Sequence, residues 1–221
     1  MNKIAILDWD GTLSQGFSIL EWIKFLSIHF NEKQYQNELN TEYKKYQTGK
    51  LKHDEFSISA TSIYANFLKD KKVSIIEDLA VKFVREKLKN MSTDVAMLFY
   101  VLKKKEIKAY VLSGAPNELL KIYSRIYNFR IIGSLQLGKT KGKYNGEIIL
   151  NSGVTIAKKN IVDKLLEKGN VLILGFGNSE SDLPIIESAK NGFVMTDSAA
   201  FINKYNIVNF DNFFDLIIEN I

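Results

Sequence analysis

The sequence contains no cysteine, which excludes disulfides, thiolate metal sites and a cysteine nucleophile. No apolar run approaches the length of a membrane-spanning helix, and no signal-like segment precedes the first predicted strand. We therefore expect a cytoplasmic globular protein without a membrane partner. With 221 residues, of which 46% are hydrophobic, the chain can form one sizeable domain, or a core domain with a smaller insert.

Arginine is scarce, which argues against a nucleic-acid-binding surface. The formal net charge is +5, but the only arginines are Arg85, Arg125 and Arg130. Arginine is the residue suited to bidentate contacts with phosphates and bases. Acidic residues are interspersed among the lysines, as at residues 103–106. We therefore interpret the lysines as solvated faces that can still attract a small anionic substrate, and we expect no nucleic-acid partner.

Proline is also rare, and none occurs before Pro116. From Ser18 to about Asn90 the apolar residues recur at helical spacing. This pattern predicts helices near residues 18–30, 32–47, 53–68 and 74–89, separated by polar or charged breaks. Residues 14–90 would then form an α-helical cap, inserted into a core that comprises residues 1–13 and 91–221.

Outside the helical region, apolar strands alternate with helices. Strands are predicted at residues 4–7, 107–112, 170–174, 193–195 and 207–208, and an antiparallel pair between residues 130 and 150. Helices are predicted at residues 95–105, 116–127, 155–168, 183–189 and 212–218. This alternation predicts an α/β fold with a Rossmann-like parallel sheet as its core and a helical cap as an insert.

Three of the predicted strands end in polar residues. Asp8 and Asp10 follow the first strand, Ser113 and Gly114 follow the second, and the glycine-rich residues 175–182 follow the third. Because the carboxyl ends of parallel strands face one crevice, these groups should meet. Two carboxylates so close repel each other unless a cation lies between them or one carries a proton. The pair indicates a metal site or an acid/base pair, and an ordinary Asp-containing turn is the remaining alternative.

Side chains with oxygen donors are expected to dominate this crevice. They are Asp8, Asp10, Asn178 and Asp182. Oxygen donors without cysteine or clustered histidine suit Mg²⁺.

The order of these motifs resembles that of the haloacid dehalogenase superfamily of phosphatases, and within it the phosphoserine-phosphatase-like branch with a helical cap. The run Asp-Trp-Asp-Gly-Thr at residues 8–12 matches the first motif, residues 113–115 match the second, Lys158 the third and residues 177–184 the fourth. The predicted cap lies between the first two motifs, as in that branch. The resemblance implies a magnesium-dependent phosphatase acting on a small-molecule phosphomonoester.

The resemblance also implies a role for each residue. Asp8 would be the nucleophile that forms an aspartyl-phosphate, and Asp10 the general acid and then the base. Mg²⁺ would be bound by Asp8, the main-chain carbonyl of Asp10 and Asn178, while Asp182 would orient a metal-bound water. The groups that would hold the substrate phosphate are Thr12, Ser113, Gly114 and Lys158.

Several alternatives remain open at individual positions. Lys159 could take the place of Lys158, and both Ser113 and Asp182 could serve only as helix caps. Trp9 is expected to pack rather than to touch substrate. The two histidines are expected at the surface; they are His29 and His53.

Two departures from the family pattern bear on activity and substrate. Asn178 stands where an aspartate is common, which removes a negative charge and predicts weaker Mg²⁺ binding. The predicted cap has no arginine before Arg85, and Phe17 and Ser18 occupy the region where serine-recognising members carry an acidic residue. Phosphoserine is therefore an unlikely substrate. The alternatives to a phosphatase are a catalytically weak member that binds phosphorylated ligands, or a phosphotransferase.

Overall fold

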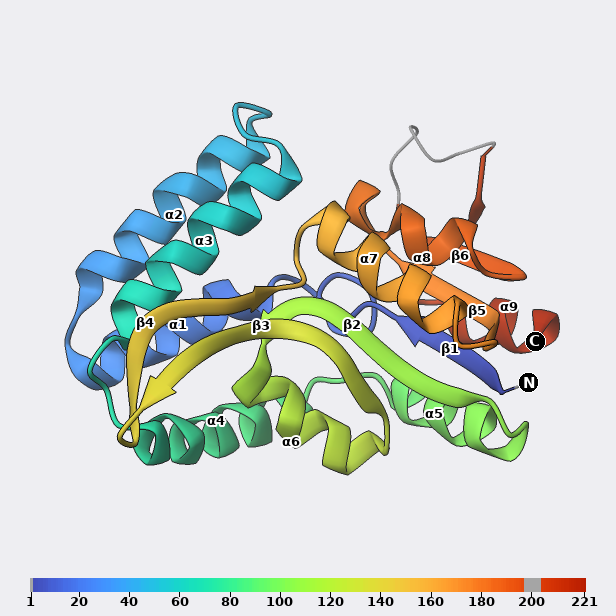
Figure 1. Cartoon of the computed structure of the whole chain (residues 1–221), viewed down its shortest axis with the longest axis horizontal. Helices are drawn as coiled ribbons and strands as arrows, with labels where there is room; N and C mark the ends of the chain where they lie inside the picture. The colour runs from blue at the N-terminus through green and yellow to red at the C-terminus, as the bar shows by residue number, and fades with distance from the viewer. Residues whose placement is uncertain (1, 197–203) are drawn as a thin grey trace.

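The computed structural model describes residues 2–196 and 204–221, and within them a seven-stranded sheet lies between two layers of helices (Figure 1). The strand order is β4-β3-β2-β1-β5-β6-β7. All neighbouring strands are parallel except β3 and β4, which form an antiparallel pair. The α/β fold with a mostly parallel, Rossmann-like sheet is therefore confirmed.

The strands are β1 (Lys3–Leu7), β2 (Lys108–Pro116), β3 (Arg130–Thr140), β4 (Lys143–Asn151), β5 (Val171–Gly177), β6 (Asn191–Met195) and β7 (Asn206–Val208). The helices that follow β1 are α1 (Ser18–Phe30), α2 (Lys33–Gln47), α3 (His53–Leu68), α4 (Val73–Leu88) and α5 (Thr93–Lys104). Those later in the chain are α6 (Asn117–Tyr127), α7 (Thr155–Leu166), α8 (Leu183–Glu187) and α9 (Phe213–Asn220).

Strand β1 lies at the centre of the sheet, and both of its faces are buried. Ile4 and Ile6 belong to a small hydrophobic cluster under α7 and α8. Ala5 and Leu7 point the other way, into a larger cluster under α5, α6 and the helices that follow β1. Alternate residues of a strand face opposite sides, so a continuous apolar run is what a strand buried on both faces requires.

The helical insert, residues 18–88, divides into two parts in space. Helices α2 and α3 form a pair that rises away from the sheet, although α3 also packs against β4, whereas α1 contacts β2 and α4 lies alongside α6 (Figure 1). Buried residues of the insert and of the sheet belong to one continuous hydrophobic cluster, which includes Trp22, Phe67 and Val84 as well as Leu7 and Val111. The insert therefore shares a core with the sheet.

Two strands extend beyond their predicted ends. Strand β2 continues through Ser113 and Gly114 to Pro116, which pairs with Leu135 of β3. Strand β5 continues to Gly177, which pairs with Val194 of β6. In both cases the hydrophobic pattern stops before the hydrogen bonding does, because a neighbouring strand still pairs with the small and polar residues. These small and polar residues therefore belong to the last part of each strand and not to the loop that follows it.

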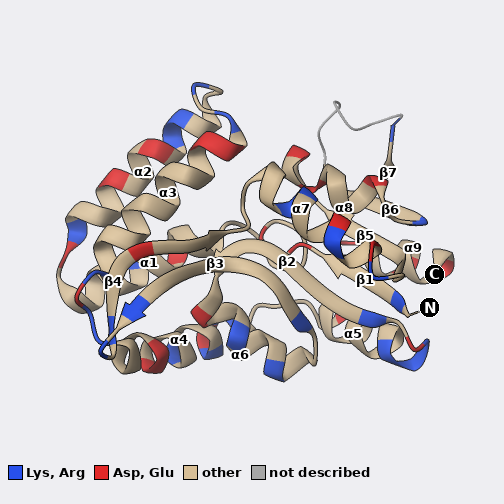
Figure 2. Ribbon diagram, in the orientation of Figure 1, with Lys and Arg blue, Asp and Glu red and all other residues tan. Residues whose placement is uncertain are grey.

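Acidic and basic side chains alternate over most helices and loops, without a large area of one sign along any element drawn in Figure 2. In the part of the chain that the structure describes, none of the helices combines the length and the apolar character needed to cross a membrane.

Candidate active site

The end of β1 brings Asp8 and Asp10 to the same side of the chain. Trp9, between them, points away into the core, where its ring lies 4.5 Å from that of Tyr123. The prediction that Trp9 packs is confirmed. Gly11 then adopts a φ of 72°, which glycine reaches without steric cost, and its N–H donates to the carbonyl of Ser14. This turn ends the strand and keeps both carboxylates at its carboxyl edge.

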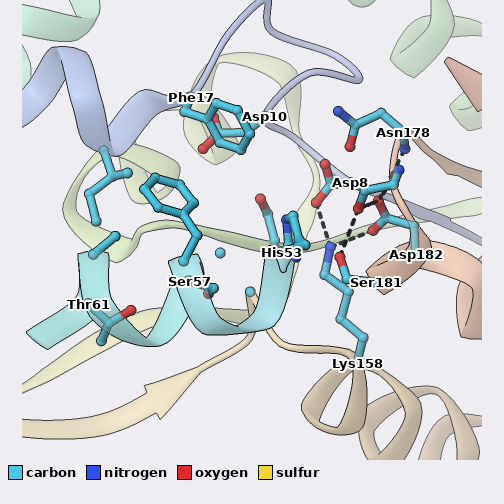
Figure 3. Close-up of a pocket in the computed structure, with 17 residues that line it drawn as sticks. Asp8, Asp10, Phe17, His53, Ser57, Thr61, Lys158, Asn178, Ser181 and Asp182 are labelled. Carbon is cyan, nitrogen blue, oxygen red and sulfur yellow. Dashed lines mark hydrogen bonds and ion pairs between the residues drawn. The ribbon is translucent and has the colours of Figure 1, made fainter. Parts of the chain in front are cut away.

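Lys158, on α7, reaches Asp8 in the interior. Its Nζ lies 2.8 Å from Asp8 Oδ1 and also donates to Asp182 Oδ1, and the lysine is only 2% exposed (Figure 3). Lys159 points to solvent and pairs with Asp163 at 2.7 Å. Of the two lysines left open by the sequence, the geometry therefore selects Lys158 as the one in contact with Asp8.

Asp182 closes the turn that follows β5. Its Oδ2 accepts hydrogen bonds from the backbone N–H of Asn178 (3.1 Å) and from both the N–H and the hydroxyl of Ser179 (3.1 and 2.9 Å). A side chain at Gly177 would place its Cβ 2.3 Å from that of Asp182, so glycine is needed for this approach. Asp182 makes no side-chain cap for α8. It holds the turn together and holds Lys158 in place.

Ser113 and Gly114 lie at the end of β2, beside the loop that leads into α7. The Ser113 hydroxyl accepts a hydrogen bond from the N–H of Ala115 at 3.3 Å, so it does not cap α6, which starts at Asn117. A Cβ at Gly114 would lie 2.8 Å from the Cα of Gly153, so the two backbones are in close contact. Both Ser113 and Gly114 face the same cavity as Asp8.

Thr12 lies behind Asp8 instead of lining the cavity. Its hydroxyl donates to Asp8 Oδ2 at 3.2 Å, and its side chain is fully buried. In this arrangement Thr12 contacts the carboxylate of Asp8 and not the space open to a ligand. The contact with phosphate expected from the sequence stays a prediction.

The carboxylates of this site differ in their affinity for protons. Burial raises the pKa of Asp8 to about 6, although the charge of Lys158 pulls it downward. Burial also raises the pKa of Asp10 to about 7, against the hydrogen bond that Ser18 donates to it. For Asp182 burial acts in the same direction, but the charge and hydrogen bond of Lys158 outweigh it and hold the pKa below its usual value.

The site has a deficit of positive charge. Three carboxylates, those of Asp8, Asp10 and Asp182, surround one ammonium group, and those of Asp8 and Asp182 raise the pKa of Lys158 above its ordinary value despite its burial. In the described part of the chain, His, Cys, Asp and Glu form no cluster of three or more that could hold a metal. A metal site here would therefore need amide or main-chain oxygens.

Asn178 supplies such an oxygen. Its amide nitrogen lies 2.0 Å from where a Cβ on Gly11 would be, so the side chain packs directly over the turn that follows Asp10. Within the described part of the chain, this side-chain amide forms no hydrogen bond. Asn178 lines the same cavity as Asp8 and Asp10. Carboxylate and amide oxygens beside an uncompensated negative charge fit Mg²⁺. The residues that would hold it are Asp8, Asp10 and Asn178.

Helix α3 forms the opposite wall of the cavity, and this contribution is absent from the motif-based prediction. Five of its residues at helical spacing face the cavity: His53, Phe56, Ser57, Ala60 and Thr61. The expectation that His53 is a surface residue is wrong, whereas His29 is exposed as predicted. The spacing in α3 was readable from the sequence, but nothing in the sequence indicated that this face meets the end of β1.

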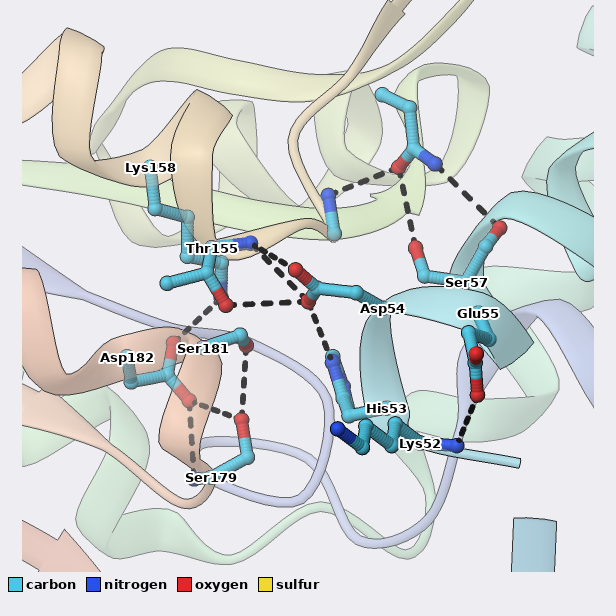
Figure 4. A network of polar contacts seen from close by, with 12 residues as sticks. Lys52, His53, Asp54, Glu55, Ser57, Thr155, Lys158, Ser179, Ser181 and Asp182 are labelled. Carbon is cyan, nitrogen blue, oxygen red and sulfur yellow. Dashed lines mark hydrogen bonds and ion pairs between the residues drawn. The ribbon is translucent and has the colours of Figure 1, made fainter. Parts of the chain in front are cut away.

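Two polar contacts connect α3 to the segment before Lys158. Asp54 accepts hydrogen bonds from the N–H and the hydroxyl of Thr155, the first residue of α7, each at 3.1 Å (Figure 4). Ser57 donates to Asn151 Oδ1 at 3.3 Å. The residue before α7, Val154, has no side chain that can cap the helix, so Asp54 takes this role from a distant part of the chain.

A family model described as haloacid dehalogenase-like hydrolase matches residues 5–187. The chain belongs to this family. The resemblance to this superfamily that the motifs indicate is thus confirmed. Among curated proteins, none matches the sequence.

Solved structures with the same fold are distant in sequence. A protein of unknown function from Bordetella pertussis Tohama I has a TM-score of 0.77 at 14% identity, over 95% of this chain and 99% of that one. A substrate-bound phosphoserine phosphatase has a TM-score of 0.68 at 16% identity, over 100% and 99%. Cytosolic 5'-nucleotidase IIIB bound to cytidine has a TM-score of 0.62 at 15% identity, over 99% and 86%. At such identities the similarity establishes the fold alone.

Proposed function

We propose that this haloacid dehalogenase-like hydrolase is a magnesium-dependent phosphatase, which cleaves a small phosphomonoester through a phosphoryl group carried on Asp8. The observation that carries the proposal is the contact of Asp8 Oδ1 with Lys158 Nζ at 2.8 Å, in a buried cavity that Asp10 also lines. Membership of a hydrolase family whose structural neighbours include phosphatases supports it.

Two steps follow from this arrangement. In the first, Asp8 attacks phosphorus, the bond from phosphorus to the leaving oxygen breaks, and Asp10 gives that oxygen a proton. In the second, Asp10 takes a proton from water, which attacks phosphorus and releases inorganic phosphate from Asp8. An acid whose pKa is about 7 is suited to both transfers, because both of its forms are populated at neutral pH.

Other groups of the cavity hold the phosphoryl oxygens and maintain the charge balance. Lys158, the hydroxyl of Ser113 and the N–H of Gly114 would donate to the oxygens on which negative charge develops. Asp8, the Asp10 carbonyl and Asn178 would hold a magnesium ion, whose positive charge would let a carboxylate approach a dianionic phosphate.

One assay tests the proposal. We expect phosphate release from p-nitrophenyl phosphate with Mg²⁺, little release with EDTA, and a loss of about 10⁴-fold or more in Asp8→Asn, because the nucleophile is removed. Asp163→Asn, at the exposed pair with Lys159, serves as the control and should keep full activity. Equal rates for all four samples would overturn the proposal.

The same assay separates the alternative functions. A phosphotransferase would release more p-nitrophenol than phosphate when glycerol is added as an acceptor. A protein that only binds phosphorylated ligands would show heat of binding for p-nitrophenyl phosphate in calorimetry but no turnover.

The metal site has a test of its own. Asn178→Asp restores the charge that the family pattern supplies, so it should lower the Mg²⁺ concentration for half-maximal activity and tighten Mg²⁺ binding measured by calorimetry. An unchanged affinity would count against Asn178 as a ligand.

A further inference from the structure

The cavity has one charged side and one uncharged side. Asp8, Asp182 and Lys158 come from the end of β1, the turn after β5 and α7, and they lie together in Figure 3. The other side is formed by Phe17 and by the cavity-facing residues of α3, which include Ser57 and Thr61. A phosphate bound against Lys158 would direct its leaving group toward this second side.

Phe17 and the cavity-facing residues of α3 contribute no fixed charge to the leaving-group side. The only ionisable group that α3 places there is the ring of His53, and burial lowers its pKa below the ordinary value, which favours the neutral form. The apolar members are Phe17, Ile19, Phe56 and Ala60. A charged leaving group would lose its water here without gaining an ionic partner, and such a loss is costly.

Thr61 offers a polar contact without charge. Thr61 is only 3% exposed and lines the cavity. Its hydroxyl forms no hydrogen bond with any of the residues that the structure describes, 2–196 and 204–221. This hydroxyl is therefore available from the cavity for a hydrogen bond with a hydroxyl group of a ligand. The hydroxyl of Ser57, in contrast, already donates to Asn151.

The space is small and its wall is tightly packed. The cavity has a volume of about 50 Å³, and one water needs roughly 10–15 Å³ on this measure. The ring of Phe17 lies within about 6 Å of the rings of Tyr43, Tyr46 and Phe56, so it is held by an aromatic cluster. A small leaving group can stay against this wall, whereas one as large as a nucleoside would have to extend out of the cavity toward solvent.

We propose that the face of α3 formed by Phe56, Ser57, Ala60 and Thr61, together with Phe17, selects phosphomonoesters of small uncharged alcohols, with Thr61 as the residue that recognises a hydroxyl group. This inference rests on the proposed phosphatase function. It assigns the substrate class by charge and size, and it excludes esters of amino acids, cationic amines and carboxylic acids.

The test uses four esters of similar length on the full-length protein with Mg²⁺. Two are neutral in the leaving group, 2-hydroxyethyl phosphate and propyl phosphate. One is cationic, 2-aminoethyl phosphate, and one is anionic, phosphoglycolate. We expect kcat/KM for each neutral ester to exceed that for each charged ester by at least about tenfold. A charged ester that is cleaved as well as the neutral ones would overturn the inference.

Two substitutions at Thr61 test its role. Thr61→Val keeps the shape and removes the hydroxyl, so it should lower kcat/KM for 2-hydroxyethyl phosphate by about 3- to 10-fold while leaving propyl phosphate unchanged or better. Thr61→Asp adds a carboxylate of similar size and should shift the preference toward 2-aminoethyl phosphate. Equal effects of Thr61→Val on both neutral esters would contradict hydroxyl recognition, even if Thr61→Asp fails to fold.

A matched control separates the site from the helix. Ile58 lies on the outer face of α3 and is 57% exposed, so Ile58→Asp adds the same charge outside the cavity and should not change the substrate preference. The two proposals also fail differently. Absence of phosphate release from all four esters and from p-nitrophenyl phosphate would overturn the phosphatase function itself, whereas turnover with a preference for charged esters would overturn only the substrate class.

Discussion

At the scale of single residues, the two aspartates after β1 have different surroundings. Asp8 is 3% exposed and accepts hydrogen bonds from Lys158 and Thr12. Asp10 is partly buried and accepts a hydrogen bond from Ser18 at the start of α1. Alternation along the chain puts both on one side, but the tertiary contacts decide which carboxylate carries an ion pair and which one holds a proton near neutral pH.

The raised pKa of Asp10 predicts that this residue destabilises the metal-free protein at high pH. Between its ordinary pKa of 3.8 and about 7, the folded state holds a proton that the unfolded state releases, so stability falls as the pH rises through this range. Asp10→Asn removes the effect. We expect it to stabilise the protein by about 1–3 kcal/mol at pH 8 and by much less at pH 5.

Urea unfolding in EDTA at the two pH values measures this difference. Asp163→Asn, which changes an exposed carboxylate, should show no such dependence on pH. A stabilisation by Asp10→Asn that is the same at pH 5 and pH 8 would show that Asp10 is not buried in its charged form.

At the scale of elements, the N-terminus of α3 and the N-terminus of α7 are joined by Asp54. Its carboxylate accepts a hydrogen bond from the first N–H of α7, where the helix dipole favours negative charge. Lys158 follows one turn later on the same helix. The wall of the cavity and the helix that carries Lys158 are therefore connected directly. We interpret α2 and α3 as a cap whose contact with the sheet domain depends on this connection.

Asp54→Ala should weaken that contact. A hydrogen bond to a charged group contributes about 1.5–3 kcal/mol to stability, and in the variant water would replace part of that contribution. Because the wall formed by α3 would be held less firmly, KM should rise by roughly 3- to 10-fold. Backbone amides of α3 should also exchange hydrogen faster. Glu55→Ala is the control for KM, because in the described part of the chain Glu55 is hydrogen-bonded only to the N–H of Lys52, at the N-terminus of α3 itself. Unchanged KM and unchanged exchange in Asp54→Ala would rule out this role.

At the scale of the whole molecule, the helical insert and the sheet are joined by one hydrophobic cluster and by a buried chain of polar groups. The indole N–H of Trp22 donates to the hydroxyl of Tyr64 at 2.9 Å, and this hydroxyl donates to Glu118 at 3.3 Å. Tyr144 donates to the other oxygen of Glu118 at 2.6 Å. The chain connects α1, α3, α6 and β4, so we expect the insert and the sheet to unfold in one transition.

Tyr64→Phe tests this connection. It leaves the Trp22 N–H without its partner and Glu118 with one donor fewer, so it should lower the free energy of unfolding by about 1–3 kcal/mol. KM should not change, because Tyr64 does not line the cavity. Tyr35→Phe is the matched control, since the Tyr35 hydroxyl forms no hydrogen bond within the described part of the chain. A separate second transition, or equal stability of the two variants, would contradict the prediction.

Much of this protein could be predicted from local patterns. The helix at residues 53–68, the helix that starts at residue 155, the strand at residues 4–7 and the parallel sheet all follow from hydrophobic periodicity and from residues that favour helix starts. The grouping of Asp8, Ser113 and Asp182 also follows, because parallel strands bring their carboxyl ends to one edge. Strand ends were less predictable, since pairing with a neighbour continues where the apolar pattern stops.

The sequence by itself thus determined the fold class and the chemical groups at the site, because both depend on periodicity and on the order of short motifs. Only the tertiary structure decided which lysine contacts Asp8 and that α3 forms an uncharged wall opposite. These facts depend on contacts between residues about 50 to 150 positions apart, such as Asp54 with Thr155 and Asp8 with Lys158. No local pattern encodes such distances, because packing of the whole chain sets them.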